Sequence, residues 1–116
     1  MEAIDSMEIA FDVQPVKNFV EGCLHHVSKK GLNEIFNESS TEEQLESFVK
    51  NNIDSCLDFS VFEKQGYEVS KKEAVIEASI NKNDVVFKMA YPIVVGKTAS
   101  KTKTEIKDFF VRHALN

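Results

Sequence analysis

The sequence predicts an α+β domain: an N-terminal antiparallel helical hairpin packed on an antiparallel β-meander of three to four strands. Two periodicities predict this fold. Apolar residues recur every three or four positions up to about residue 57, as on one face of a helix, and at every second position afterwards, as on one face of a strand. The polar stretches NESSTEE (37–43) and NKND (81–84) separate these segments as turns.

A chain of 116 residues suits a single domain, which we place at residues 13–116. Residues 1–12 are set apart as an N-terminal segment, because Met7 offers a second start and Ile9 and Phe11 alternate in phase with Val13. This segment is expected either to add an edge strand or to be foreign to the native domain.

The first helix is expected from about Pro15 to about Phe36. Pro15 fits the first helical turn, where its missing N–H is not needed. Gly31 either ends the helix early or marks a site of close packing. One apolar stripe at helical spacing supports the assignment: Val16, Phe19, Val20, Cys23, Leu24 and Val27.

The second helix is expected to end near Leu57. Ser40 with Glu43, or Thr41 with Gln44, has the spacing of a capping box at its start. Its apolar stripe contains Leu45, Phe48, Val49, Ile53 and Cys56. A short linker between two amphipathic helices favours an antiparallel hairpin.

Strand-like alternation starts with Phe59 and Val61, and continues through EAVIEASI (73–80) and VVFKMAYPIVV (85–95). Gly66 and Gly96 are expected to mark turns, and Pro92 an edge, a bulge or a strand end. The strongest strand has one apolar face: Val85, Phe87, Met89, Tyr91, Ile93 and Val95.

The C-terminal stretch SKTKTEIK (100–107) alternates charged residues against Thr102, Thr104 and Ile106. We expect the charged residues to point outward and to oppose edge-to-edge pairing: Lys101, Lys103, Glu105 and Lys107. The tail DFFVRHALN (108–116) fits either a continuation of this strand or a short helix.

Composition excludes several classes of function. The net charge of −5 argues against nucleic acid, whose phosphates are normally met by a basic face, and against anionic lipid headgroups. No apolar run approaches the length that spans a bilayer, and the N-terminus lacks the pattern of a signal peptide. The expected partner is therefore a protein, and the oligomeric state is left open.

The two cysteines lie on the apolar stripes of the two predicted helices. In an antiparallel hairpin Cys23 and Cys56 reach comparable heights, so their Cα atoms can approach within the roughly 7 Å that a disulfide needs. Two alternatives remain open at this point: separate buried thiols in a cytosolic protein, or a metal pair. No CxxC or CxxH motif supplies further ligands, which weakens the metal reading.

No other grouping predicts a catalytic site, a metal site or a cofactor. Three were weighed and are interpreted as ordinary helix or surface residues: Cys23 with His26, Glu21 with His25, and Asp54, Asp58 and Glu63. No Gly-rich phosphate loop is present, and we expect the chain to have no enzymatic activity. His113 lies in the tail and has no assigned role.

Two surface features complete the candidates. Asn37 begins the triplet NES in the linker and fits the pattern for N-glycosylation. Phe109 and Phe110 are candidate contacts with a partner, or else they close the core at the end of the sheet.

Three stretches resemble a group of uncharacterised archaeal proteins: VQPVKNFVEGCLHHVSKKGL (13–32), LESFVKNNIDSCLDFSVFEKQGYEV (45–69) and NDVVFKMAYPIVVGKTASKTKTEIKDFFV (83–111). The resemblance implies a membrane-anchored domain outside the cell membrane, with Cys23 and Cys56 paired and no known activity. The short hydrophobic anchor of that group is missing here, as expected of a trimmed soluble chain. A longer glycine-containing insertion between the helices is replaced by NEIFNESSTEE (33–43).

The leading hypothesis is therefore a non-enzymatic interaction domain at the outer face of an archaeal membrane, which pairs a sheet edge with a partner strand. One rival is a cytosolic interaction module with reduced cysteines. Another is a carrier of a small apolar ligand, with a cavity between helices and sheet lined by Phe87, Met89 and Tyr91.

Overall fold

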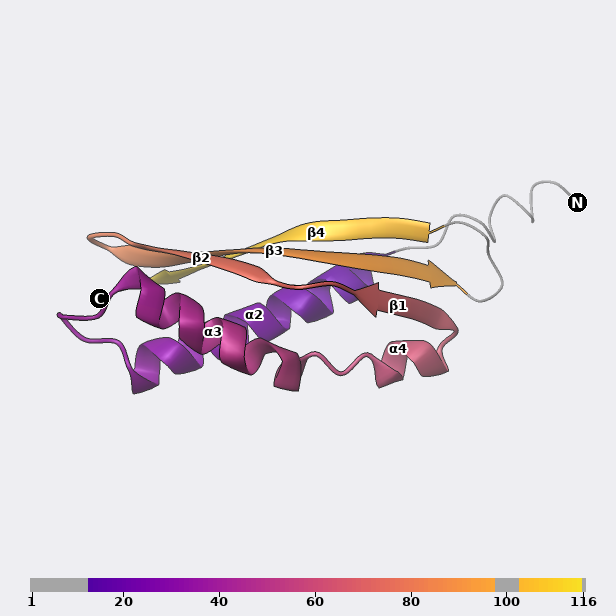
Figure 1. The fold of residues 1–116 in the computed structure, drawn as a ribbon, viewed down its shortest axis with the longest axis horizontal. Helices are drawn as coiled ribbons and strands as arrows, with labels where there is room; N and C mark the ends of the chain where they lie inside the picture. Colours follow the sequence, from indigo (N-terminus) through magenta and orange to yellow (C-terminus); the bar gives the residue numbers. More distant parts are fainter. Residues whose placement is uncertain (1–12, 98–102, 116) are drawn as a thin grey trace, which may run out of the picture.

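A computed structural model describes residues 13–97 and 103–115 of the chain. Figure 1 shows all three described helices on one side of a four-stranded antiparallel sheet, whose other side none of these three helices covers. The predicted α+β class, with helices first and strands after, is confirmed.

The helical hairpin consists of α2 (Gln14–Glu34) and α3 (Glu42–Cys56). Pro15 lies in the first turn of α2, as predicted. Thr41 caps α3: its hydroxyl accepts from the Gln44 N–H, and the Gln44 side chain accepts from the Thr41 N–H, so both halves of the capping box form. Gly31 does not end α2. It lies inside the helix, where an added Cβ would stand 2.8 Å from the ring of Phe48.

A short helix that sequence reasoning missed, α4 (Ser60–Lys64), connects α3 to the sheet. Phe59 immediately precedes it and Phe62 lies within it, and both rings pack on Phe19 of α2, at centroid distances of 5.5 and 5.4 Å. The predicted alternation at Phe59 and Val61 is therefore wrong. Gly66 follows with a φ of +93°, which confirms the turn there.

The sheet contains β1 (Tyr67–Lys71), β2 (Val75–Ile80), β3 (Asp84–Lys97) and β4 (Lys103–Ala114). β3 is the central strand. β4 pairs along one side of it, and β1 and β2 pair with opposite ends of its other side. Strands β2, β3 and β4 thus follow one another as a meander. β1 also pairs with β3, on the same side as β2 but at the other end of the strand.

The turn NKND joins β2 to β3 as predicted. The backbone N–H of Asn81 donates to the Asp84 carbonyl at 2.8 Å, and the Asn81 side-chain amide donates to the Asp84 carboxylate at 2.7 Å. The predicted turn at Gly96 is wrong, because β3 continues to Lys97 and Gly96 pairs on both sides. The predicted inner face of β3 is buried at all six positions: Val85, Phe87, Met89, Tyr91, Ile93 and Val95.

Pro92 lies at a bulge, one of the three positions predicted for it. Between Ala90 and Ile93 the register with β4 shifts, so that two residues of β3 stand opposite Lys107 alone. The shift reverses the alternation of β4, because Ile106 pairs with buried Ile93, while Phe109, three positions later, pairs with buried Met89.

The tail continues β4 as a strand to Ala114 and does not form a helix. Lys103, Glu105 and Lys107 are exposed, as predicted for the charged row. Lys101 of that row, Thr102 on the opposite face, and the predicted edge strand through Ile9 and Phe11 lie outside the described residues.

Candidate functional site

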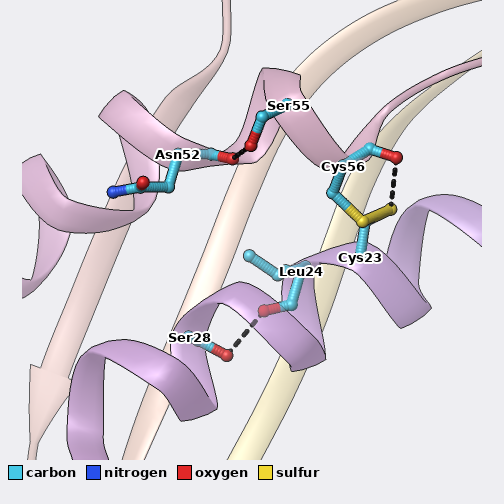
Figure 2. The surroundings of a disulfide bond; sticks show 6 residues. All are labelled: Cys23, Leu24, Ser28, Asn52, Ser55 and Cys56. Carbon is cyan, nitrogen blue, oxygen red and sulfur yellow. Dashed lines mark hydrogen bonds between the residues drawn. A yellow bond between two sulfur atoms is a disulfide. The ribbon is translucent and has the colours of Figure 1, made fainter. Parts of the chain in front are cut away.

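Cys23 of α2 and Cys56 of α3 form a disulfide bond, with their Cα atoms 5.7 Å apart (Figure 2). The pairing inferred from the two apolar stripes is confirmed, and in this structure neither sulfur is a free thiol or a metal ligand. The Cys23 sulfur also lies 3.2 Å from the Cys56 carbonyl oxygen. Because a disulfide sulfur carries no hydrogen, this is a close sulfur–oxygen contact.

The two sides of the disulfide differ in their access to solvent. Cys23 is buried in the core, with 4% of its surface exposed, whereas Cys56 is half-buried. A shallow hollow of about 210 Å³ reaches the Cys56 side and is lined by His26, Val27, Lys30, Asn52, Ser55 and Cys56. A thiol reagent would therefore meet Cys56 first, while Cys23 stays within the hydrophobic core.

A second link holds α2 to β4, through a buried histidine. His113 Nε2 lies 2.7 Å from the hydroxyl oxygen of Ser28, which itself lies 2.6 Å from the Leu24 carbonyl. Because the single hydroxyl hydrogen is directed to the helix backbone, Ser28 accepts from His113, and the neutral imidazole carries its proton on Nε2. Ser28 is fully buried, so a substrate cannot reach this Ser–His pair.

The surroundings of His113 disfavour its charged form. Burial lowers the pKa of His113 below its ordinary value, and electrostatic interactions with the nearby His25 and Lys29 lower it further. The His25 ring centroid lies 4.8 Å from that of His113, and the Phe87 ring packs against its other side at 5.9 Å. Sequence reasoning gave His113 no role, because only the reversed alternation of β4 turns it toward α2.

The predicted carboxylates do not form one site. Asp54 accepts a hydrogen bond from the Tyr91 hydroxyl at 2.9 Å. The pKa of Tyr91 is raised, mainly because the side chain is buried and also because of its hydrogen bond to this carboxylate. Asp58 accepts from the Ser60 N–H at the start of α4, which lowers the pKa of Asp58. Glu63 lies exposed on α4. Among the described residues, no group of three or more His, Cys, Asp or Glu could hold a metal ion.

One margin of the sheet is closed by carboxylates from α3. The backbone N–H groups of Ala78 and Ile80 on β2 donate to Glu46 and Glu42, each at 2.8 Å. These N–H groups would otherwise be free to pair with an added strand. Strand addition is therefore opposed along β2, and sequence reasoning could not place these two glutamates against the sheet.

The uncovered face of the sheet carries an apolar hollow. Val75 of β2 is 63% exposed there, opposite Ala90 of β3, and Phe110 of β4 is 52% exposed, opposite Lys88. The hollow measures about 340 Å³, and its lining includes three charged side chains, Glu77, Lys88 and Asp108. Phe109 points the other way and is 2% exposed, so its prediction as a surface contact is corrected: it closes the core.

Asn37 lies exposed in the linker between α2 and α3. Its side-chain oxygen accepts hydrogen bonds from the Ser39 N–H and the Ser39 hydroxyl, both at 2.8 Å. Glycosylation there stays a prediction.

Searches for related proteins gave no family by which to interpret these features. No family model, no curated protein and no solved structure matches the chain. Within the described ranges, no helix has the length and apolar character needed to cross a membrane. The candidate site therefore has to be interpreted from its own chemistry.

Proposed function

We propose that this chain is a non-enzymatic interaction domain of an archaeal envelope protein, which is anchored in the membrane and works outside the cytoplasm. Its partner is a protein that contacts the uncovered face of the sheet at Phe110. The observation that carries the location is the Cys23–Cys56 disulfide.

A disulfide of this kind supports an oxidising compartment. Cytosolic thiols are kept reduced in most organisms, whereas disulfides persist in extracytoplasmic proteins. Both cysteines of the chain are used in this one bond. It joins the two helices 33 positions apart, where the chain-entropy model gives roughly 3.5 to 4 kcal/mol. A small domain gains a large share of its stability from such a bond.

The contact surface is supported by the exposed apolar side chains on the uncovered face. Val75 and Phe110 border a hollow whose rim is charged, the pattern of an apolar centre with a polar margin that protein interfaces use. Aromatic side chains often contribute most to such contacts. Phe110 is therefore the residue that we expect to matter most for binding.

The two rival functions have less support. A cytosolic module would keep Cys23 and Cys56 reduced, although their geometry is that of a bonded pair. A carrier of a small apolar ligand needs a cavity between the layers. The three side chains expected to line it, Phe87, Met89 and Tyr91, are at most 2% exposed within the core, and the apolar hollow lies on the opposite face.

The compartment can be tested in intact cells of the source organism. Cells are treated with a membrane-impermeant amine reagent, then lysed in a thiol-alkylating reagent, and the mass of the chain is measured. We expect labelled lysines and unmodified cysteines. A chain that takes up two alkyl groups and stays unlabelled until lysis would contradict the proposal. A cytosolic protein of the same cells serves as the matched control for labelling.

A further inference from the structure

Among the described residues, no strand lies beside the outer edge of β4. Within the described ranges, β4 pairs with β3 alone, and it runs for 12 residues from Lys103 to Ala114. Figure 1 shows it at the border of the sheet, with the helices on one side of the sheet plane. An unpaired edge of this length presents a row of backbone N–H and C=O groups.

The opposite margin of the sheet is protected in two ways that β4 lacks. It consists of two short strands, β1 with 5 residues and β2 with 6. Two of its amides, of Ala78 and Ile80, are also bonded by the α3 carboxylates. In residues 103–115, no backbone amide of β4 donates to a side chain in this way. The edge of β4 is therefore the place where a strand can be added.

Three side chains on β4 make this edge complementary to itself. Asp108, Phe110 and Arg112 occupy alternate positions, all are exposed, and all lie on the uncovered face. Their order is acidic, aromatic, basic. When such a strand lies antiparallel to a copy of itself, centred on the aromatic residue, each acid faces a base.

We propose that two copies of the chain associate by antiparallel pairing of their β4 edges, with the two-fold axis at Phe110. Asp108 then lies opposite the partner's Arg112, and the two Phe110 rings meet at the axis. Opposite-charge and aromatic pairs in directly facing positions both stabilise antiparallel strands. The two sheets become one continuous sheet, with the helices of both copies on the same side. Phe110 is shared with the proposed contact surface, but the self-association requires no extracytoplasmic location.

The charges also select this register over its neighbours. Only the arrangement centred on Phe110 sets Asp108 opposite Arg112. A two-fold axis at Asp108 would place two carboxylates face to face, and an axis at Arg112 two guanidinium groups, which destabilises pairing. In this register Lys103 and Glu105 lie beyond the paired stretch and stay in water, while Lys107 comes opposite the partner's His113.

The test is the mass of the full chain in solution, measured by sedimentation velocity over a concentration series. We expect a monomer–dimer equilibrium in the wild type. D108R and R112D should each weaken it by at least about tenfold, because each homodimer would then contain two like-charge pairs. An equimolar mixture of D108R and R112D should dimerise again, since the mixed pair restores both opposite-charge contacts.

Arg112 also forms an ion pair with Asp84 inside the chain, so R112D is checked for folding by circular dichroism and D108R is interpreted independently. Val61→Lys is the matched control, because Val61 is a comparably exposed valine on α4, away from both the β4 edge and the uncovered face of the sheet. A wild type that stays monomeric at every concentration would overturn the proposal. A dimer broken by Val61→Lys and kept by D108R would do the same. Neither outcome bears on the labelling and alkylation test of the compartment.

Discussion

The two links that hold α2 in place differ in what can undo them. At α3 the link is the Cys23–Cys56 bond, which is lost on reduction and does not titrate. At β4 it is the contact of buried His113 with Ser28, which is insensitive to reductant, whereas charging the imidazole is disfavoured by burial and by the nearby His25 and Lys29. The redox-sensitive link and the acid-sensitive link thus use two different residues of α2, Cys23 and Ser28, and each can be changed without the other.

The largest expected effect comes from removing the disulfide. The double variant Cys23→Ala with Cys56→Ala should lose roughly 3.5 to 4 kcal/mol of unfolding free energy, because the unfolded chain is no longer cross-linked. Urea denaturation with and without reductant measures this. Reductant should reproduce the loss in the wild type and change nothing in the variant. Equal urea midpoints for wild type and variant would contradict a stabilising role.

The second effect concerns acid. The unfolded chain binds a proton at His113 near the ordinary pKa of about 6.5, whereas the folded chain binds it only at lower pH. The stability contributed by neutral His113 is therefore fully present above about pH 6.5 and is lost as the pH falls below it. Denaturation at a series of pH values should show this decline.

Two variants separate His113 from other titrating groups. His113→Phe fills the space beside Phe87 with a ring that cannot titrate, so the decline below about pH 6.5 should become shallower. His26→Gln removes an exposed histidine and should leave the decline unchanged. If both variants follow the wild-type curve, another group governs the acid sensitivity.

The third effect concerns the contact between α2 and α3, where Gly31 lies against the ring of Phe48. Gly31→Ala places a methyl group 2.8 Å from the ring and should destabilise the fold by about 1 kcal/mol, despite the better helix propensity of alanine. Gly22→Ala, on the same helix with open space around it, should instead stabilise by up to about 1 kcal/mol. Thermal unfolding of both variants checks this, and shifts of the same sign would show that the close contact has no cost.

The smallest effect concerns the closed margin of the sheet. Glu46→Gln keeps an acceptor for the Ala78 N–H but removes its charge, and we expect a loss of about 0.5 to 1 kcal/mol. Glu43→Gln, on an exposed part of α3, is the control and should be neutral. Faster amide exchange at Ala78 in the Glu46 variant alone would support the assignment. Unchanged exchange would show that the carboxylate leaves the edge unprotected.

Local signals predicted the helical part well. Pro15, the capping box at Thr41 and the two apolar stripes act over a few residues, so the sequence contains all that they require. The disulfide could be inferred because both cysteines lie on those stripes. The helix α4 was missed because a five-residue segment around Phe59 fits either periodicity, and only its packing on Phe19 decides.

The site features that could not be predicted depend on distant pairing. His113 and Ser28 are 85 positions apart, and Glu46 meets Ala78 across 32. The burial of Phe109 depends on the register shift opposite Lys107, since an unbroken continuation of the charged alternation would have turned Phe109 to solvent. Hydrophobic periodicity does not reveal such a register shift, although Pro92 indicated a position where a bulge could occur.

The bulge at Pro92 acts as a joint between two short ribbons. On one side of it Phe87 and Met89 face α2 and α3, and on the other side Ile93 and Val95 face inward as well. Deleting Pro92 would shift the alternation of β3 by one residue on one side of the deletion. Either Phe87 and Met89 or Ile93 and Val95 would then have to turn away from the helices. A single proline thus sets which side chains both ends of the sheet turn toward the helices, and with it that Phe109 is buried while Phe110 is exposed.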